Sequence, residues 1–103
     1  MGQRGYLLLK ADLSFLDENA ADEQIWDLIQ SIEKIRDIEY VANTVGTYDF
    51  VATVDSQETI ESVAEEVKNI IPGWIKEVIP LTENNLFKKH RELKDLEILN
   101  NMH

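Results

Sequence analysis

The sequence contains no cysteine, which excludes disulfides, thiolate nucleophiles and zinc–thiolate centres together. Its longest apolar runs, such as Tyr6-Leu7-Leu8-Leu9, are far shorter than the roughly 20 residues needed to span a bilayer. The residues after Met1 also lack the charged start and apolar core of a signal peptide. These absences predict a soluble protein with a cytoplasmic location.

Basic residues are few: 10 Lys and Arg stand against 20 Asp and Glu among 103 residues, a formal net charge of -10. Residues 1–83 hold six of the basic and seventeen of the acidic residues, a net charge of -11. A surface this acidic repels phosphate groups, so we expect no direct binding to nucleic acid or to an anionic membrane.

Residues suited to catalysis or metal binding are also scarce. The two histidines, His90 and His103, lie near the C-terminus without a partner at ligand spacing, and no serine has the GxSxG context of a hydrolase. The four glycines are too scattered to form a phosphate-binding loop. We therefore expect a non-catalytic protein with no metal and no cofactor.

Hydrophobic spacing predicts six main elements. Ile25, Leu28, Ile29 and Ile32 recur at helical spacing, and so do the apolar residues of 60–71, which follow a capping-box-like start at Asp55. The expected order is a strand over 5–13, a helix over 25–35, strands over 38–45 and 48–54, a helix up to 71, and a strand over 74–79 ended by a proline. This order predicts an α+β, ferredoxin-like βαββαβ fold, with a four-stranded antiparallel sheet and two helices on one face.

Both faces of the predicted sheet carry apolar residues. If Leu7 and Leu9 face the helices, then Tyr6 and Leu8 face the other way, and a sheet with one solvated face would alternate more cleanly. A second copy of the sheet, in a dimeric α/β-barrel type of assembly, is the simplest cover. The competing cover is the segment 84–103, whose apolar spacing predicts a C-terminal amphipathic helical extension to the domain over 1–83.

The segment Gly46-Thr47-Tyr48-Asp49 is the candidate binding site, because a tight hairpin turn can present side chains and backbone amides to a small ligand. A purely structural interpretation stays open. Gly46 suits the turn, Tyr48 can pack on Trp74 or across a dimer, and Asp49 can accept hydrogen bonds from turn amides.

Residues 5–82 resemble the regulatory (RAM) domain of the Lrp/AsnC family of transcription regulators. The resemblance rests on the first strand Tyr6-Leu7-Leu8-Leu9-Lys10, on the hairpin Gly46-Thr47-Tyr48-Asp49-Phe50, and on the helix exit Ile71-Pro72-Gly73. It implies a homodimer formed through the sheets, higher ring oligomers, and a small effector, typically an amino acid, bound between dimers. The implied ligand-binding residues are Gly46, Thr47, Tyr48 and Asp49, together with Glu77 where many members have Thr or Ser.

Family regulators carry an N-terminal helix-turn-helix, whereas the first strand expected here begins by about residue 5. The resemblance therefore implies a stand-alone form that reaches DNA only through partners such as full-length Lrp/AsnC regulators. Two alternatives stay open: an adaptor that forms mixed oligomers with those regulators, or a dimeric α/β-barrel enzyme using Tyr40, Trp26 or Asn43.

Overall fold

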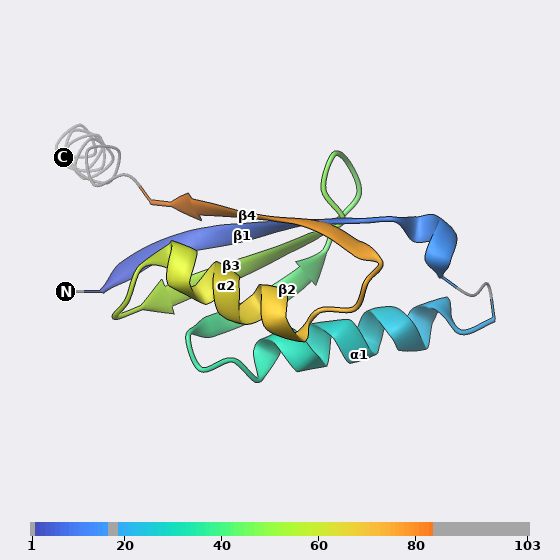
Figure 1. Ribbon diagram of the computed structural model, residues 1–103, viewed down its shortest axis with the longest axis horizontal. Coiled ribbons are helices and arrows are strands. Elements are labelled where there is room, and N and C mark those ends of the chain that lie inside the picture. The colour runs from blue at the N-terminus through green and yellow to red at the C-terminus, as the bar shows by residue number, and fades with distance from the viewer. Residues whose placement is uncertain (1, 17–18, 84–103) are drawn as a thin grey trace, which may run out of the picture.

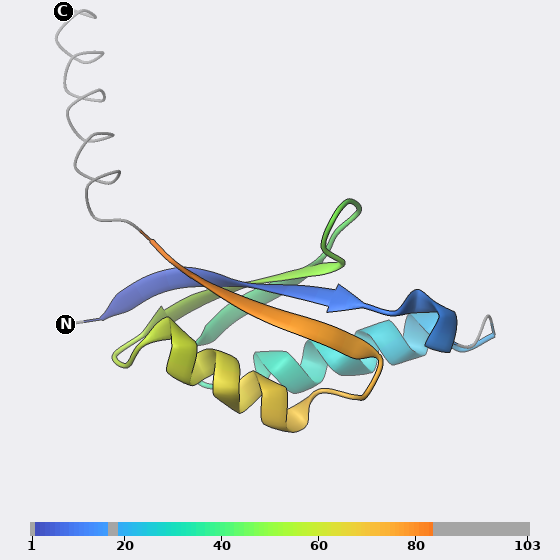
Figure 2. The same ribbon diagram turned by 45° about the horizontal axis from the view of Figure 1, so that its top comes forward.

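The computed structural model describes residues 2–16 and 19–83. Their elements are β1 (Gln3–Ala11), the short 3-10 helix η1 (Leu13–Phe15), α1 (Ala21–Glu33), β2 (Ile38–Asn43), β3 (Phe50–Ser56), α2 (Ile60–Ile70) and β4 (Ile75–Thr82). The sheet has the order β2-β3-β1-β4, and every neighbouring pair is antiparallel. Both helices lie on one side of this sheet (Figures 1 and 2). The predicted α+β, ferredoxin-like fold is confirmed.

The core lies between the sheet and the helices. Alternate residues of the two central strands face the helices, so that Leu7, Leu9, Phe50 and Ala52 are 0% exposed. The helices contribute the residues at three- and four-residue spacing: Leu28, Ile32, Ile60, Val63, Ala64 and Val67. One hydrophobic core therefore joins all four strands to both helices.

Gly5 allows β1, α2 and β4 to approach one another closely. A Cβ atom at this position would overlap the carbonyl oxygen of Leu81 and would lie 2.9 Å from Cγ1 of Ile60. Gly5 is buried between these neighbours. A side chain at Gly5 would therefore push the edge strand or the start of α2 away from the core.

The ends of several elements differ from the sequence-based expectation. The strand β1 ends at Ala11, before the expected residue 13, because the side chain of Asp12 accepts a hydrogen bond from the Ser14 amide and starts the turn of η1. The helix α2 begins at Ile60, and its cap is Thr59, whose side chain accepts a hydrogen bond from the amide of Ser62. The expected start at Asp55 is wrong, since that residue still belongs to β3.

The strand β4 also runs beyond its expected end. Pro80 was expected to stop it, yet β4 continues to Thr82 and pairs Pro80 with Leu7. This is possible because β4 is an edge strand, where one side of the backbone has no neighbour that needs a donor. The extra residues place Leu81 beside Tyr6 and carry the chain to Glu83.

The predicted helix over 84–103 falls outside the described residues. Among the residues that are described, no helix is long and apolar enough to cross a membrane.

Candidate functional site

The hairpin between β2 and β3 has a six-residue loop, 44–49, where a two-residue turn was expected. Hydrogen bonds across its base hold the longer loop: the Thr44 amide donates to the Asp49 carbonyl at 2.8 Å, and the Thr44 hydroxyl donates to the Tyr48 carbonyl at 2.8 Å. Gly46 has φ +143, a conformation that favours glycine. The loop stands above the sheet in Figure 1.

Asp49 fastens this loop to β1. Its amide donates to the Leu9 carbonyl at 2.9 Å, and its Oδ2 accepts a hydrogen bond from the Ala11 amide at 2.8 Å. The contact lies where the register between β1 and β4 shifts, at Lys10/Ala11. Lys10 adds a second tie, from its Nζ to the carbonyl of Thr47 at 2.7 Å. Asp49 thus has a structural role, although the amide it satisfies belongs to β1 and not to the turn.

A hollow of about 500 Å³ opens beside this attachment. Its lining residues come from the end of β1, the loop and the start of β4: Lys10, Ala11, Asp12, Leu13, Asp49, Lys76 and Glu77. Two of the predicted ligand-binding residues, Asp49 and Glu77, therefore meet at one place. Gly46, Thr47 and Tyr48 do not line this hollow, and only Thr47 is tied to its wall, through Lys10.

The hollow carries charges of both signs. The Ser14 hydroxyl, 2.6 Å from Oδ1 of Asp12, and then the Ser14 amide lower the pKa of the Asp12 carboxyl, and Lys76 acts in the same direction. Lys76 places its Nζ 5.0 Å from the centre of the Phe15 ring. Two ammonium groups and three carboxylates within one hollow suit a small zwitterion, which needs a partner of each sign. Sequence reasoning missed Lys10, Lys76 and Asp12, because a strand register is needed to bring them together.

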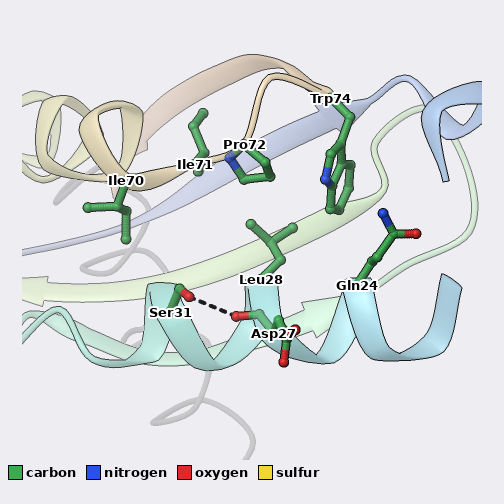
Figure 3. A pocket seen from close by; sticks show the side chains of 8 residues that line it. All are labelled: Gln24, Asp27, Leu28, Ser31, Ile70, Ile71, Pro72 and Trp74. Atoms are coloured by element: carbon green, nitrogen blue, oxygen red, sulfur yellow. Dashed lines mark hydrogen bonds between the residues drawn. The ribbon is translucent and has the colours of Figure 1, made fainter. Parts of the chain in front are cut away.

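A second hollow, of about 340 Å³, lies between α1 and the connection from α2 to β4 (Figure 3). Gln24, Asp27 and Ser31 of α1 form one side, and the residues Ile70, Ile71, Pro72 and Trp74 form the other. Ser31 donates its hydroxyl to the Asp27 carbonyl at 2.8 Å. The ring centres of Trp74 and Phe50 lie 6.2 Å apart. Among the described residues Trp74 makes no ring contact with Tyr48, which was one of the two packings left open for that tyrosine.

The sheet face away from the helices is the third candidate surface. Strand register aligns two uncharged rows across all four strands: Tyr40, Thr53, Tyr6 and Leu81 in one, and Ala42, Val51, Leu8 and Ile79 in the other. We call these eight residues the outer face. Tyr6 is 42% and Tyr40 56% exposed. The outer face is bounded by charged residues, with Arg4 opposite Asp55 at one end and Lys10 opposite Glu77 at the other.

The residues considered for an enzymatic role do not converge. Tyr40 belongs to the outer face, Trp26 is an exposed residue of α1, and Asn43 donates its side-chain amide to the Asp49 carbonyl at 2.9 Å. They line no common hollow among those described. Within residues 2–16 and 19–83, no group of three or more His, Asp or Glu is placed to hold a metal ion.

Comparison with known proteins shows the fold. No protein-family model matches the sequence, and no curated protein matches it. Among solved structures, TTHA0845 from Thermus thermophilus matches with a TM-score of 0.56 and 17% identity, over 80% of this chain and 92% of that one. MtbAldR matches with a TM-score of 0.57 and 19% identity, over 79% of this chain. The match covers 51% of MtbAldR, so the chain corresponds to about half the length of that protein.

Proposed function

We propose that the chain is a non-catalytic module of the Lrp/AsnC regulatory-domain type, which pairs with a second copy through its outer face and binds a small amino acid. The observation that carries the proposal is the outer face itself, eight uncharged residues in two rows across the sheet. The sequence resemblance supports the family, and the shared fold with TTHA0845 and MtbAldR agrees with it.

Pairing through the outer face follows from the energetics of exposed apolar surface. Contiguous apolar patches on soluble proteins usually mark an interaction site. A sheet face presented to a copy of itself gives a closed, two-fold interface with matching chemistry on both sides. Specific interfaces bury about 800 Å² on each partner, so the outer face would have to be covered over most of its extent.

The sheet edges are less suited to assembly than the outer face. At the β2 edge, the Val41 amide donates to Oε1 of Glu33 at 3.3 Å, so a side chain already occupies this donor. At the β4 edge, Pro80 has no amide hydrogen to offer. Addition of another strand at either edge would therefore lose hydrogen bonds, which favours contact between faces.

For the ligand we propose an amino acid in the hollow beside the hairpin. Lys10 and Lys76 would hold its carboxylate, and Glu77 its ammonium group, while Asp49 keeps the loop attached to β1. Gly46, Thr47 and Tyr48 would complete the site at a contact between dimers in a ring, as the resemblance implies. Ligand binding would then change the assembly, and through it the activity of full-length regulators joined to it.

Calorimetric titration of the full chain with each of the twenty amino acids tests the ligand. We expect at least one to bind, and Glu77→Gln and Tyr48→Ala to weaken that binding. Asp27→Asn, in the hollow of Figure 3, is the matched control and should leave binding unchanged. Absence of heat with all twenty, or equal affinity in the wild type and Glu77→Gln, would remove the ligand from the proposal.

A further inference from the structure

We propose that residues 84–91 fold back over the outer face of their own chain and compete there with a second copy. The site is a hollow of about 230 Å³ at the Arg4 end of that face. Its lining residues are Arg4, Gly5, Tyr6, Glu39, Tyr40, Thr53 and Glu83.

The side chains of this hollow would be stabilised by a segment that covers them. Tyr6 and Tyr40 flank Thr53 on the neighbouring strands, and both rings are substantially exposed. The Thr53 hydroxyl is buried, yet it has no hydrogen-bond partner in the described structure. A segment laid across Tyr6 and Tyr40 would remove their exposed rings from water, which is favourable.

The charge at the rim favours a basic occupant. Arg4 donates to Glu39 at 2.8 Å and to Asp55 at 3.2 Å, and Glu83 lies 4.0 Å from its Nε. Arg4 is thus shared between the Glu39 and Asp55 carboxylates, and these three groups together carry a net charge of -1. The carboxylates of Glu39 and Asp55 are partly exposed, so a further cation can reach them without large desolvation.

The chain itself supplies such a segment at the right place. The Glu83 amide donates to the Arg4 carbonyl at 2.8 Å, so the last described residue lies at the rim of the hollow. The following residues are apolar at Leu86-Phe87 and then basic at Lys88, Lys89 and Arg91. Four residues reach at most about 14 Å, enough to lay Phe87 on Tyr6 or Tyr40 and the basic residues near the carboxylates.

With this four-residue reach, Phe87 cannot arrive at the hollow of Figure 3 in the same chain. That hollow contains Trp74, next to the first residue of β4, whereas the segment begins after the last. The two ends of β4 are about 23 Å apart, at about 3.3 Å for each residue step along a strand. Figure 2 shows them at opposite ends of the sheet.

Competition with a second copy follows because both would contact Tyr6 and Tyr40; this part rests on the proposed pairing of outer faces. If the segment covers the hollow in about nine chains of ten, the apparent dissociation constant of the dimer is about tenfold weaker than without the cover. Residues 84–91 would then set the concentration at which the chain pairs.

Charge removal tests the competition. In the full-length variant Lys88→Gln/Lys89→Gln/Arg91→Gln, we expect dimerisation about tenfold tighter by sedimentation equilibrium, although the net charge becomes more negative. The matched control Lys34→Gln/Arg36→Gln/Lys68→Gln makes the same charge change around the helices and should dimerise no more tightly than the wild type. Equal or weaker dimerisation of the first variant, relative to the control, would overturn the competition.

Disulfide formation tests the contact itself, independently of any dimer, because the chain has no cysteine of its own. The double variant Glu39→Cys/Lys88→Cys, oxidised at low concentration, should form a disulfide within one chain. The pair Ser31→Cys/Lys88→Cys, with one cysteine in the hollow of Figure 3, should not. Equal yields from the two pairs, or none from the first, would overturn the contact even if the wild type dimerises. Conversely, a disulfide in the first pair with no dimer in any variant would reject the pairing of faces and leave the contact standing.

Discussion

The two faces of the sheet have similar apolar character but opposite environments. On the inner face Leu7 and Phe50 are 0% exposed beneath the two helices, whereas on the outer face Tyr6 and Leu81 are 42% and 45% exposed. Tyr6 and Leu7 are consecutive residues of β1, so the two environments alternate along one strand. Residues of a strand alternate between the two faces, so polar residues could occupy the outer face without disturbing the core. The uncharged rows found there instead indicate a second packing surface.

Truncation of one aromatic residue on each face gives the largest expected effects. Phe50→Ala removes a fully buried ring that packs on Trp74, and should lower the free energy of unfolding by about 3–5 kcal/mol. Tyr6→Ala, measured in urea at concentrations where the chain is monomeric, should cost about 1 kcal/mol. Equal losses for the two variants would mean that the two faces do not differ as described.

The hairpin attachment supplies the next effect, because it fixes the register that separates the two faces. Asp49→Ala leaves the Ala11 amide without its acceptor and should cost about 1–3 kcal/mol, while Asp49→Asn keeps an acceptor oxygen and should cost less. Urea unfolding of both variants measures this. A larger loss for Asn than for Ala would show that the hydrogen bond to Ala11 does not hold the loop.

The helix α2, which covers part of the inner face, is stabilised by the cap at its first turn. Thr59→Ala removes the cap to the Ser62 amide and should cost about 1 kcal/mol by thermal or urea unfolding. Asp55→Ala is the control: it removes an exposed pairing with Arg4 and should cost only a few tenths of that energy. A larger loss of stability for Asp55→Ala than for Thr59→Ala would assign the cap to Asp55, as the sequence pattern predicted.

The smallest expected effect is on the pKa of Asp12, in the hollow beside the hairpin. Ser14→Ala removes the hydroxyl that lowers the pKa of Asp12, so this pKa should rise toward its ordinary range when followed by NMR. Because the folded-state pKa is lowered, the ionised carboxylate stabilises the fold at neutral pH, and this contribution is lost as the pH falls through the folded-state pKa. Ser31→Ala, whose hydroxyl bonds a backbone carbonyl, should leave the pKa of Asp12 unchanged.

Sequence patterning predicted the fold because its evidence is periodic and local. Leu28 and Ile32 repeat at helical spacing, and both are buried on one side of α1. Leu7 and Leu8 are consecutive strand residues, and they lie on opposite faces of the sheet as their positions predict. The ends of the elements were harder to predict, because they depend on the arrangement of the folded sheet. The cap at Thr59 depends on where β3 ends, and the continuation of β4 through Pro80 depends on β4 being an edge strand. The prediction of a two-residue hairpin turn was wrong because the loop is held by β1. The contact that holds it joins Ala11 and Asp49, which are 38 residues apart in sequence.

The candidate site was predictable only in part, for the same reason. Asp49 and Glu77 were expected as ligand-binding residues, and they line one hollow with Lys10 and Lys76. The two lysines carry no motif and become neighbours of the loop only through the pairing of β1 with β4. A role in binding for Gly46, Thr47, Tyr48, Asp49 and Glu77 stays a prediction, to be decided by titration.

The pairing of outer faces is tested most directly by sedimentation equilibrium of the full chain beside two matched variants. Leu8→Glu places a charge at the centre of the outer face, and Ile70→Glu places the same charge on an exposed residue of α2. We predict that the wild type and Ile70→Glu reach a dimer as concentration rises, while Leu8→Glu stays a folded monomer. A dimer of unchanged affinity in Leu8→Glu, or a wild type that remains monomeric even with Lys88, Lys89 and Arg91 neutralised, would contradict the account.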